Sequence, residues 1–278
     1  MILGRPLELM ALCAVCCTLL PLSLGSSGTE RCPAINVFYQ DKVTAASPAK
    51  ESPLACNITA LDARQRERMR VLLSQFRAGV QEVKELPNGY SFRLSTDSSI
   101  ITSLGEYINM ERLCCPFFDF AIEAEREDGP IWITLTGRDG VKEFARAEFG
   151  VAEIIGNGPA RGNGPARHAS HVAAKGRQSP LVCNDGALSP AQLDRIVAVV
   201  KELRAGKLAV NELPDGYAIR LPLDAQVIHD VADYMAILRV CSPYFETRLE
   251  IGSEGGPVWL RTTGREGVKQ LAKLELGI

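Results

Sequence analysis

A glutamate and two adjacent cysteines carry the main potential for chemistry in this sequence. Glu111 falls on two adjoining stripes of otherwise apolar residues that recur at spacings of three and four, one reaching Cys114 and the other Cys115, a pattern typical of an amphipathic helix. We therefore expect the Glu111 side chain to be buried, which costs several kcal/mol unless a partner compensates or the pKa of the carboxyl rises. The two cysteines, one helical turn further along, are the nearest candidates for that partner.

The chain contains two copies of one domain. Glu-Leu-Pro-Asn-Gly-Tyr at 85–90 returns as Glu-Leu-Pro-Asp-Gly-Tyr at 212–217, and Gly-Pro-Ile-Trp at 129–132 returns as Gly-Pro-Val-Trp at 256–259. Both pairs are 127 residues apart, and no gap is needed between 54 and 150. Self-similarity at a fixed offset indicates a tandem duplication. We call 54–150 repeat 1 and 181–278 repeat 2.

The duplication adds a fourth residue to the candidate site. Cys56 and Cys114 have counterparts in repeat 2 at Cys183 and Cys241, so we expect Cys56 to approach Cys114. Repeat 2 has Leu238 in place of the glutamate and Ser242 in place of the second adjacent cysteine. The candidate constellation is therefore limited to repeat 1, where it comprises Cys56, Glu111, Cys114 and Cys115.

The first residues have the pattern of a signal peptide. An apolar run over 9–20 follows Arg5, and Ser23-Leu24-Gly25 supplies the small residues of a cleavage site. We expect 1–25 to be removed and the protein to be exported, either periplasmic or secreted. The run is shorter than the ~20 residues that span a bilayer, so no membrane anchor is expected after cleavage. Export makes disulfides possible among the six remaining cysteines: Cys32, Cys56, Cys114, Cys115, Cys183 and Cys241.

Three interpretations of the cysteines remain open. In the first, Cys56–Cys114 and Cys183–Cys241 are equivalent disulfides that staple an interaction module without chemistry, and Cys32 pairs with Cys115. In the second, Cys56, Cys114 and Cys115 are thiolates that bind a soft metal ion. Two- or three-coordinate soft ions tolerate adjacent cysteines better than a tetrahedral zinc site does.

The third interpretation is catalysis by the thiols, with Glu111 as proton donor or acceptor. Cys114 and Cys115 would lie at the carboxyl end of their helix, just before Pro116. The helix dipole there disfavours a thiolate by ~0.3–1 kcal/mol, whereas reactive cysteines favour helix amino termini. We therefore expect binding rather than an enzyme.

Each repeat predicts an α+β domain with the element order α-β-α-β-β-α. The first helix is expected at 63–78 and again at 190–205, because Asp62 with Gln65, and Ser189 with Gln192, have the spacing of a capping box. Alternating apolar residues predict three strands per repeat, and a three-stranded sheet packed against helices is the simplest architecture. An irregular segment over 26–53 precedes repeat 1, and a Gly-, Pro- and Ala-rich linker over 151–180 separates the repeats.

Charge narrows the choice of partners. The formal net charge is −2 and no basic stripe is visible, so the sequence argues against nucleic-acid binding. Pairing of the two repeats with each other in pseudo-twofold fashion is the one association that the duplication itself suggests. The sequence identifies no protein partner.

The segment Glu-Arg-Leu-Cys-Cys-Pro-Phe-Phe-Asp-Phe at 111–120, with Leu-Thr-Gly at 135–137, resembles a family of small, largely uncharacterised bacterial proteins. These share a Glu-x-x-Cys-Cys-x-Phe-Phe-x-Phe core and are associated with the neighbourhood of metal-responsive regulators. The resemblance covers each repeat, and repeat 2 departs from it at Leu238 and Ser242. Relatives without signal peptides imply reduced thiols in the family. That implication favours the soft-metal interpretation, with Cys56, Cys114 and Cys115 as ligands and Glu111 assisting.

Overall fold

The computed structural model describes residues 51–157 and 178–278. The expected signal peptide, nearly all of the 26–53 segment and most of the expected linker lie outside these residues. The first seven residues of the expected linker form a helix, α4 (Val151–Asn157), and Val151 is buried.

Both repeats have the same order of elements. Repeat 1 contains, in chain order, α1 (Ala63–Gly79), β1 (Glu82–Leu86), β2 (Gly89–Leu94), α2 (Ser99–Cys114), β3 (Asp119–Ala124), β4 (Ile131–Thr136) and α3 (Val141–Glu148), with α4 after it. Repeat 2 contains α5 (Pro190–Gly206), β5 (Ala209–Leu213), β6 (Gly216–Leu221), α6 (Ala225–Cys241), β7 (Phe245–Ile251), β8 (Val258–Gly264) and α7 (Val268–Leu276). A short 3-10 helix precedes the first α-helix of each repeat, at Ile58–Ala60 and Asp185–Ala187.

The helices expected from capping signals are confirmed. Asp62 accepts a hydrogen bond from the Gln65 backbone N–H, and the Gln65 side chain accepts one from the Asp62 backbone N–H. Ser189 and Gln192 form the same reciprocal pair at the start of α5. Each box satisfies backbone donors that a helix start leaves unpaired.

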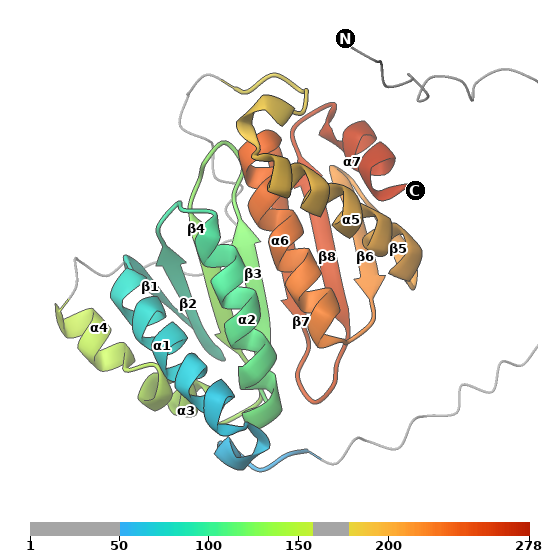
Figure 1. The fold of residues 1–278 in the computed structure, drawn as a ribbon. Helices are drawn as coiled ribbons and strands as arrows, with labels where there is room; N and C mark the ends of the chain where they lie inside the picture. Colours follow the sequence, from blue (N-terminus) through green and yellow to red (C-terminus); the bar gives the residue numbers. More distant parts are fainter. Residues whose placement is uncertain (1–50, 158–177) are drawn as a thin grey trace, which may run out of the picture. The chain divides into compact units, whose positions relative to one another are not determined.

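The expected fold class is wrong in its main feature. The structure has one eight-stranded antiparallel sheet, in the order β1-β2-β4-β3-β7-β8-β6-β5, rather than two separate three-stranded sheets (Figure 1). Each repeat supplies four strands, and β3 of repeat 1 pairs with β7 of repeat 2. Both repeats therefore belong to one structural unit.

The missed strands are β1 and β5, the two edges of the sheet. The sequence of β1 is Glu-Val-Lys-Glu-Leu, so charged side chains lie on both of its faces. The alternation of apolar and polar residues that predicts a strand is therefore obscured. Natural edge strands carry charge in this way because unpaired backbone groups would otherwise invite aggregation. The two-residue turn Pro87-Asn88 joins β1 to β2, where Leu86 pairs with Gly89.

The strand pairing between the repeats is symmetric. Ile122 of β3 lies opposite Leu249 of β7, which is its own counterpart 127 residues later. Phe120 lies opposite Ile251, and the same register follows if the repeats are exchanged. The contact is thus isologous, as in a twofold dimer, although one chain supplies both halves. On the polar face of the sheet, Arg248 pairs with Glu123 across the junction.

Four helices form a layer over one face of the sheet. They lie in the order α1, α2, α6, α5, with α2 and α6 adjacent at the junction (Figure 1). These two helices meet at Gly105 and its counterpart Ala232, where a Cβ on Gly105 would lie 2.6 Å from the Ala232 Cβ. The glycine lets the two backbones come together.

The β-hairpin of each repeat reaches the other repeat. The backbone N–H of Glu254, in the β7–β8 turn, donates to the carbonyl of Pro116 at 2.7 Å. The Glu127 N–H donates to the Pro243 carbonyl at 2.6 Å in the reciprocal contact. The Glu254 carboxylate also accepts from the Ser52 hydroxyl at 2.6 Å. Repeat 2 therefore holds the loop that follows Cys115.

The close approach of α2 and α6 predicts a stability effect. Gly105→Val should lower the free energy of unfolding by about 1–3 kcal/mol, because side-chain atoms would be forced against Ala232 in a packed junction. Gly156→Val in α4, where a Cβ would meet nothing within 4 Å, is the matched control and should change stability little. Urea unfolding measures both. Equal losses in the two variants would show that the helix junction is not tightly packed.

Candidate metal centre

The three cysteines of repeat 1 come from two segments that backbone hydrogen bonds hold together. Cys114 is the last residue of α2, and the Cys115 N–H caps the helix by donating to the Glu111 carbonyl at 2.7 Å. Cys56 precedes the 3-10 helix, and the next residue, Asn57, donates its N–H to the Cys114 carbonyl at 2.8 Å. This contact brings Cys56 to the end of α2, as the repeat comparison predicted.

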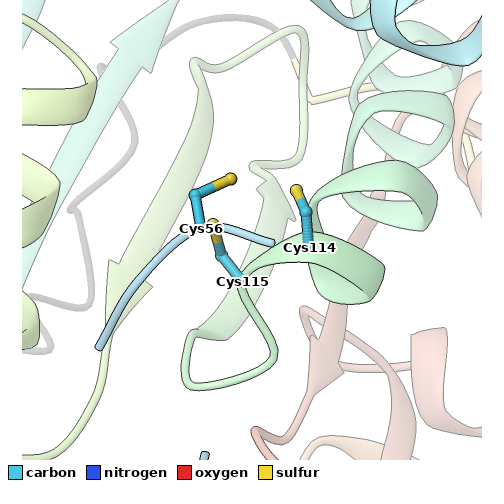
Figure 2. A group of neighbouring side chains, drawn as sticks. All are labelled: Cys56, Cys114 and Cys115. Atoms are coloured by element: carbon cyan, nitrogen blue, oxygen red, sulfur yellow. The ribbon is translucent and has the colours of Figure 1, made fainter. Parts of the chain in front are cut away.

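The three thiols converge (Figure 2). Their Sγ atoms all lie within 4.8 Å of one another. With metal–sulfur bonds of ~2.3 Å, neighbouring sulfurs of a trigonal or tetrahedral site are roughly 4 Å apart. Only a small movement would bring these three sulfurs onto one ion. Cys114 and Cys115 are fully buried, whereas Cys56 is partly exposed. Of the three cysteines, Cys56 therefore lies nearest to solvent.

No disulfide joins the five cysteines of the described ranges, which are all free thiols. Cys32, the proposed partner of Cys115 in the disulfide interpretation, lies outside those ranges. Cys56, Cys114 and Cys115 therefore form a cluster of three thiols with no disulfide bond among them.

Glu111 is buried, as its place on the apolar stripe predicted. Its exposed fraction is 0 %, and the Tyr107 hydroxyl donates to its Oε2 at 2.9 Å. The same Oε2 lies 4.0 Å from the Cys114 Sγ. The other carboxyl oxygen, Oε1, is buried with no hydrogen bond of ordinary geometry among the described residues, and the Cys115 thiol is close enough to lower the pKa of the carboxyl. A buried polar atom left unpaired is costly, so Oε1 is suited to receive a ligand.

Burial and the nearby Cys114 charge raise the pKa of the Glu111 carboxyl to about 8, despite the hydrogen bond from Tyr107. A hydrogen bond from the Cys115 thiol lowers the pKa of Cys114 to about 7. Burial raises the pKa of Cys56 to about 12, and the interaction with Cys114 raises that of Cys115. At neutral pH the cluster therefore favours one shared thiolate beside a neutral carboxyl.

The expected helix-dipole penalty on Cys114 is outweighed locally. The dipole at a helix carboxyl end disfavours a thiolate by less than about 1 kcal/mol. Two neighbouring thiols, those of Cys115 and Cys56, donate to the Cys114 sulfur and lower its pKa. Hydrogen bonds to a charged group are worth more than this dipole term, so the thiolate is stabilised where the sequence alone argued against it.

Two contributors were missed at the sequence level. Tyr107 is the first, and its i, i+4 spacing to Glu111 was the available signal. The charge of Glu148, at the end of α3, adds to the effects of burial and of Cys114 that raise the pKa of Glu111, and it opposes the lowering of the Cys114 pKa. No sequence pattern links α3 to the end of α2, so Glu148 could only be found in the structure.

Repeat 2 preserves the scaffold of this site without its chemistry. Asn184 donates to the Cys241 carbonyl at 2.8 Å, repeating the contact that holds Cys56. The Cys183 thiol is exposed and donates to Asp185 at 3.0 Å. Because Leu238 replaces the glutamate, the buried Tyr234 hydroxyl has no carboxyl partner, and its polar neighbour is the buried Thr262 hydroxyl.

Comparison of this chain with known proteins finds no similar protein. No protein-family model matches this chain, and no curated protein or solved structure is significantly similar to it. Within 51–157 and 178–278, no helix has the length and apolar character needed to cross a membrane.

The buried carboxyl predicts a pH dependence of stability. Because the pKa of Glu111 rises from 4.5 to about 8 on folding, the folded state binds the extra proton between these pH values. The free energy of unfolding of the metal-free protein should therefore fall as pH rises from about 5 to about 6.5, by up to ~1.4 kcal/mol per unit from this group. This interval lies below the titration of Cys114, which acts with the opposite sign.

The control is Glu111→Leu, which installs the residue that repeat 2 carries. Urea unfolding under reducing conditions at the two pH values should show a smaller fall for this variant than for the native chain. Identical pH slopes would mean that Glu111 is ionised in the folded protein.

Proposed function

We propose that repeat 1 binds one soft, thiophilic metal ion through the thiolates of Cys56, Cys114 and Cys115. The observation that carries the proposal is the convergence of three sulfur atoms within 4.8 Å at the end of α2. Glu111 lies outside this group of three sulfurs, and in the proposal it assists as an oxygen ligand or a neutral hydrogen-bonding neighbour, with Oε2 4.0 Å from the Cys114 Sγ.

The donor set favours soft ions over hard ones. Thiolates select ions such as Cu(I), zinc or thiophilic heavy metals, whereas Mg²⁺ and Ca²⁺ require oxygen ligands. Cys114 already favours the thiolate near neutral pH, so an arriving ion meets one charged ligand. Binding then displaces protons from Cys56 and Cys115, and affinity should rise with pH.

The same geometry supports binding rather than an enzyme. Cys114, Cys115 and Glu111 are fully buried, which leaves little space at the sulfurs for a substrate larger than an ion. Export through the 1–25 segment remains part of the proposal. In an oxidising compartment, a bound ion would protect the three thiols from forming disulfides.

The competing proposal is a stapled interaction module with Cys56–Cys114 and Cys183–Cys241 bridges. Intact mass of the protein purified from its native compartment, with and without reduction and alkylation, separates the two. Free Cys114 and Cys115 support the metal proposal. A fully oxidised chain without metal supports the stapled module.

Metal binding predicts unequal effects of two equivalent substitutions. The reduced full chain should bind one Cd(II) ion, seen as thiolate-to-metal charge-transfer absorption in the ultraviolet. Cys114→Ser should weaken binding by about a hundredfold or more, because a thiolate ligand and the low-pKa member of the cluster are both lost. Its counterpart Cys241→Ser in repeat 2 should leave the affinity unchanged. Equal losses would place the ion elsewhere.

Repeat 2 should gain a site when the missing groups are restored. Leu238→Glu with Ser242→Cys recreates the constellation around Cys183 and Cys241, and the new carboxyl gives the Tyr234 hydroxyl a partner. The number of Cd(II) ions bound should rise from one to two. Leu238→Glu alone, which adds no thiol, is the control and should still bind one ion. A double variant that folds, judged by circular dichroism, yet binds one ion would show that the two scaffolds are not equivalent.

A further inference from the structure

Repeat 2 contains a large cavity in the place that corresponds to the thiol site of repeat 1. It has a volume of about 1100 Å³ and lies between α5, the end of α6, α7 and the segment 181–188. Most of its lining is aliphatic, with Leu238 and Cys241 at the end of α6. Ligand pockets in proteins have this size and character, with a few polar groups among apolar walls.

Large apolar side chains at this cavity are exposed to solvent. Val182, Val197 and Leu274 line it and have exposed fractions of 59 %, 70 % and 71 %. Single exposed apolar residues are ordinary, but several around one cavity indicate a surface that is covered when the protein works.

Repeat 1 provides an internal reference for these positions. The two copies share the order of their elements from α1 to α3 and from α5 to α7, so the residues that line the cavity can be compared position by position. Repeat 1 has Ala55 at the position of Val182, Arg70 at that of Val197 and Ala147 at that of Leu274. At the position of Leu238 it has Glu111. At these four positions repeat 2 is the more apolar copy, whereas Asp185 and Ser242 at the same cavity replace Ile58 and Cys115 of repeat 1.

One cation stands at the cavity without an ion pair. Lys201 lines it, where repeat 1 has Ser74, and its ammonium forms no salt bridge within the described ranges. Arg204, also at the cavity, is already engaged, because it donates to the backbone carbonyls of Leu274 and Glu275. Two acids also line the cavity. The Cys183 thiol donates to Asp185, and burial raises the pKa of Glu275, an effect that the charge of Arg204 offsets in part.

We propose that repeat 2 binds a fatty acid, with its aliphatic chain in the cavity and its carboxylate at Lys201. The apolar walls remove the chain from water, at ~0.8 kcal/mol per buried CH₂, and the free ammonium pairs with the head group. This site is separate from the thiols of repeat 1. Loss of metal binding in Cys114→Ser therefore leaves fatty-acid binding intact, so the two proposals fail independently.

The test uses the reduced full chain and cis-parinaric acid, a fluorescent fatty acid, displaced by palmitate. Val197→Arg with Leu274→Ala installs the residues that the same fold accepts in repeat 1, and should weaken binding at least tenfold. Val71→Arg, at an exposed valine of α1 in repeat 1, is the matched control and should have no effect. Lys201→Ser should weaken palmitate by about fivefold and leave the uncharged hexadecanol unchanged.

Two results would overturn the proposal. The first is an absence of saturable binding of cis-parinaric acid, or binding that Val197→Arg with Leu274→Ala does not weaken. The second is a dimer of the native chain, in analytical ultracentrifugation, that this double variant converts to monomer while palmitate has no effect. In that case a second copy of the chain covers the cavity.

Discussion

The antiparallel pairing of β3 with β7 is the contact on which the rest of the structure depends. It turns two duplicated sequences into halves of one sheet, with Ile122 and Leu249 facing each other at the centre. The symmetric register places α2 beside α6, so that Gly105 must be small, and it sends each hairpin across the junction. Had the strands slipped by one residue, every side chain of β3 would have moved to the opposite face of the sheet.

The thiol site inherits its rigidity from that junction. Cys114 and Cys115 lie where α2 ends, and the following loop is held at Pro116 by the Glu254 N–H of the other repeat. On the other side, Asn57 ties Cys56 to the same helix end. Sulfur atoms positioned by backbone contacts need little rearrangement to accept an ion, which reduces the entropic cost of binding.

The local structure could be predicted where short-range chemistry determines it. The capping boxes at Asp62 and Ser189 set the starts of α1 and α5, and the apolar stripe identified Glu111 as buried. The pairing of β3 with β7 could not be predicted. The residue pattern of an apolar strand is the same whether the strand lies beside solvent, a helix or a second copy of itself. Glu148 was missed for a similar reason, since its influence on Glu111 acts through space between elements far apart in sequence.

The two copies show how one position in a fold can be turned to different chemistry. Repeat 2 has Leu238 at the position of the glutamate, so the buried Tyr234 hydroxyl lacks the carboxyl partner that Tyr107 has in repeat 1. The replacement, Leu238, lines the cavity of repeat 2 together with the exposed Val197 and Leu274. A charged or metal-filled cluster and an apolar ligand are incompatible at one site, because each raises the desolvation cost of the other. In the functions that we propose, the duplication removes that conflict, because each chemistry has its own copy of the same helix end.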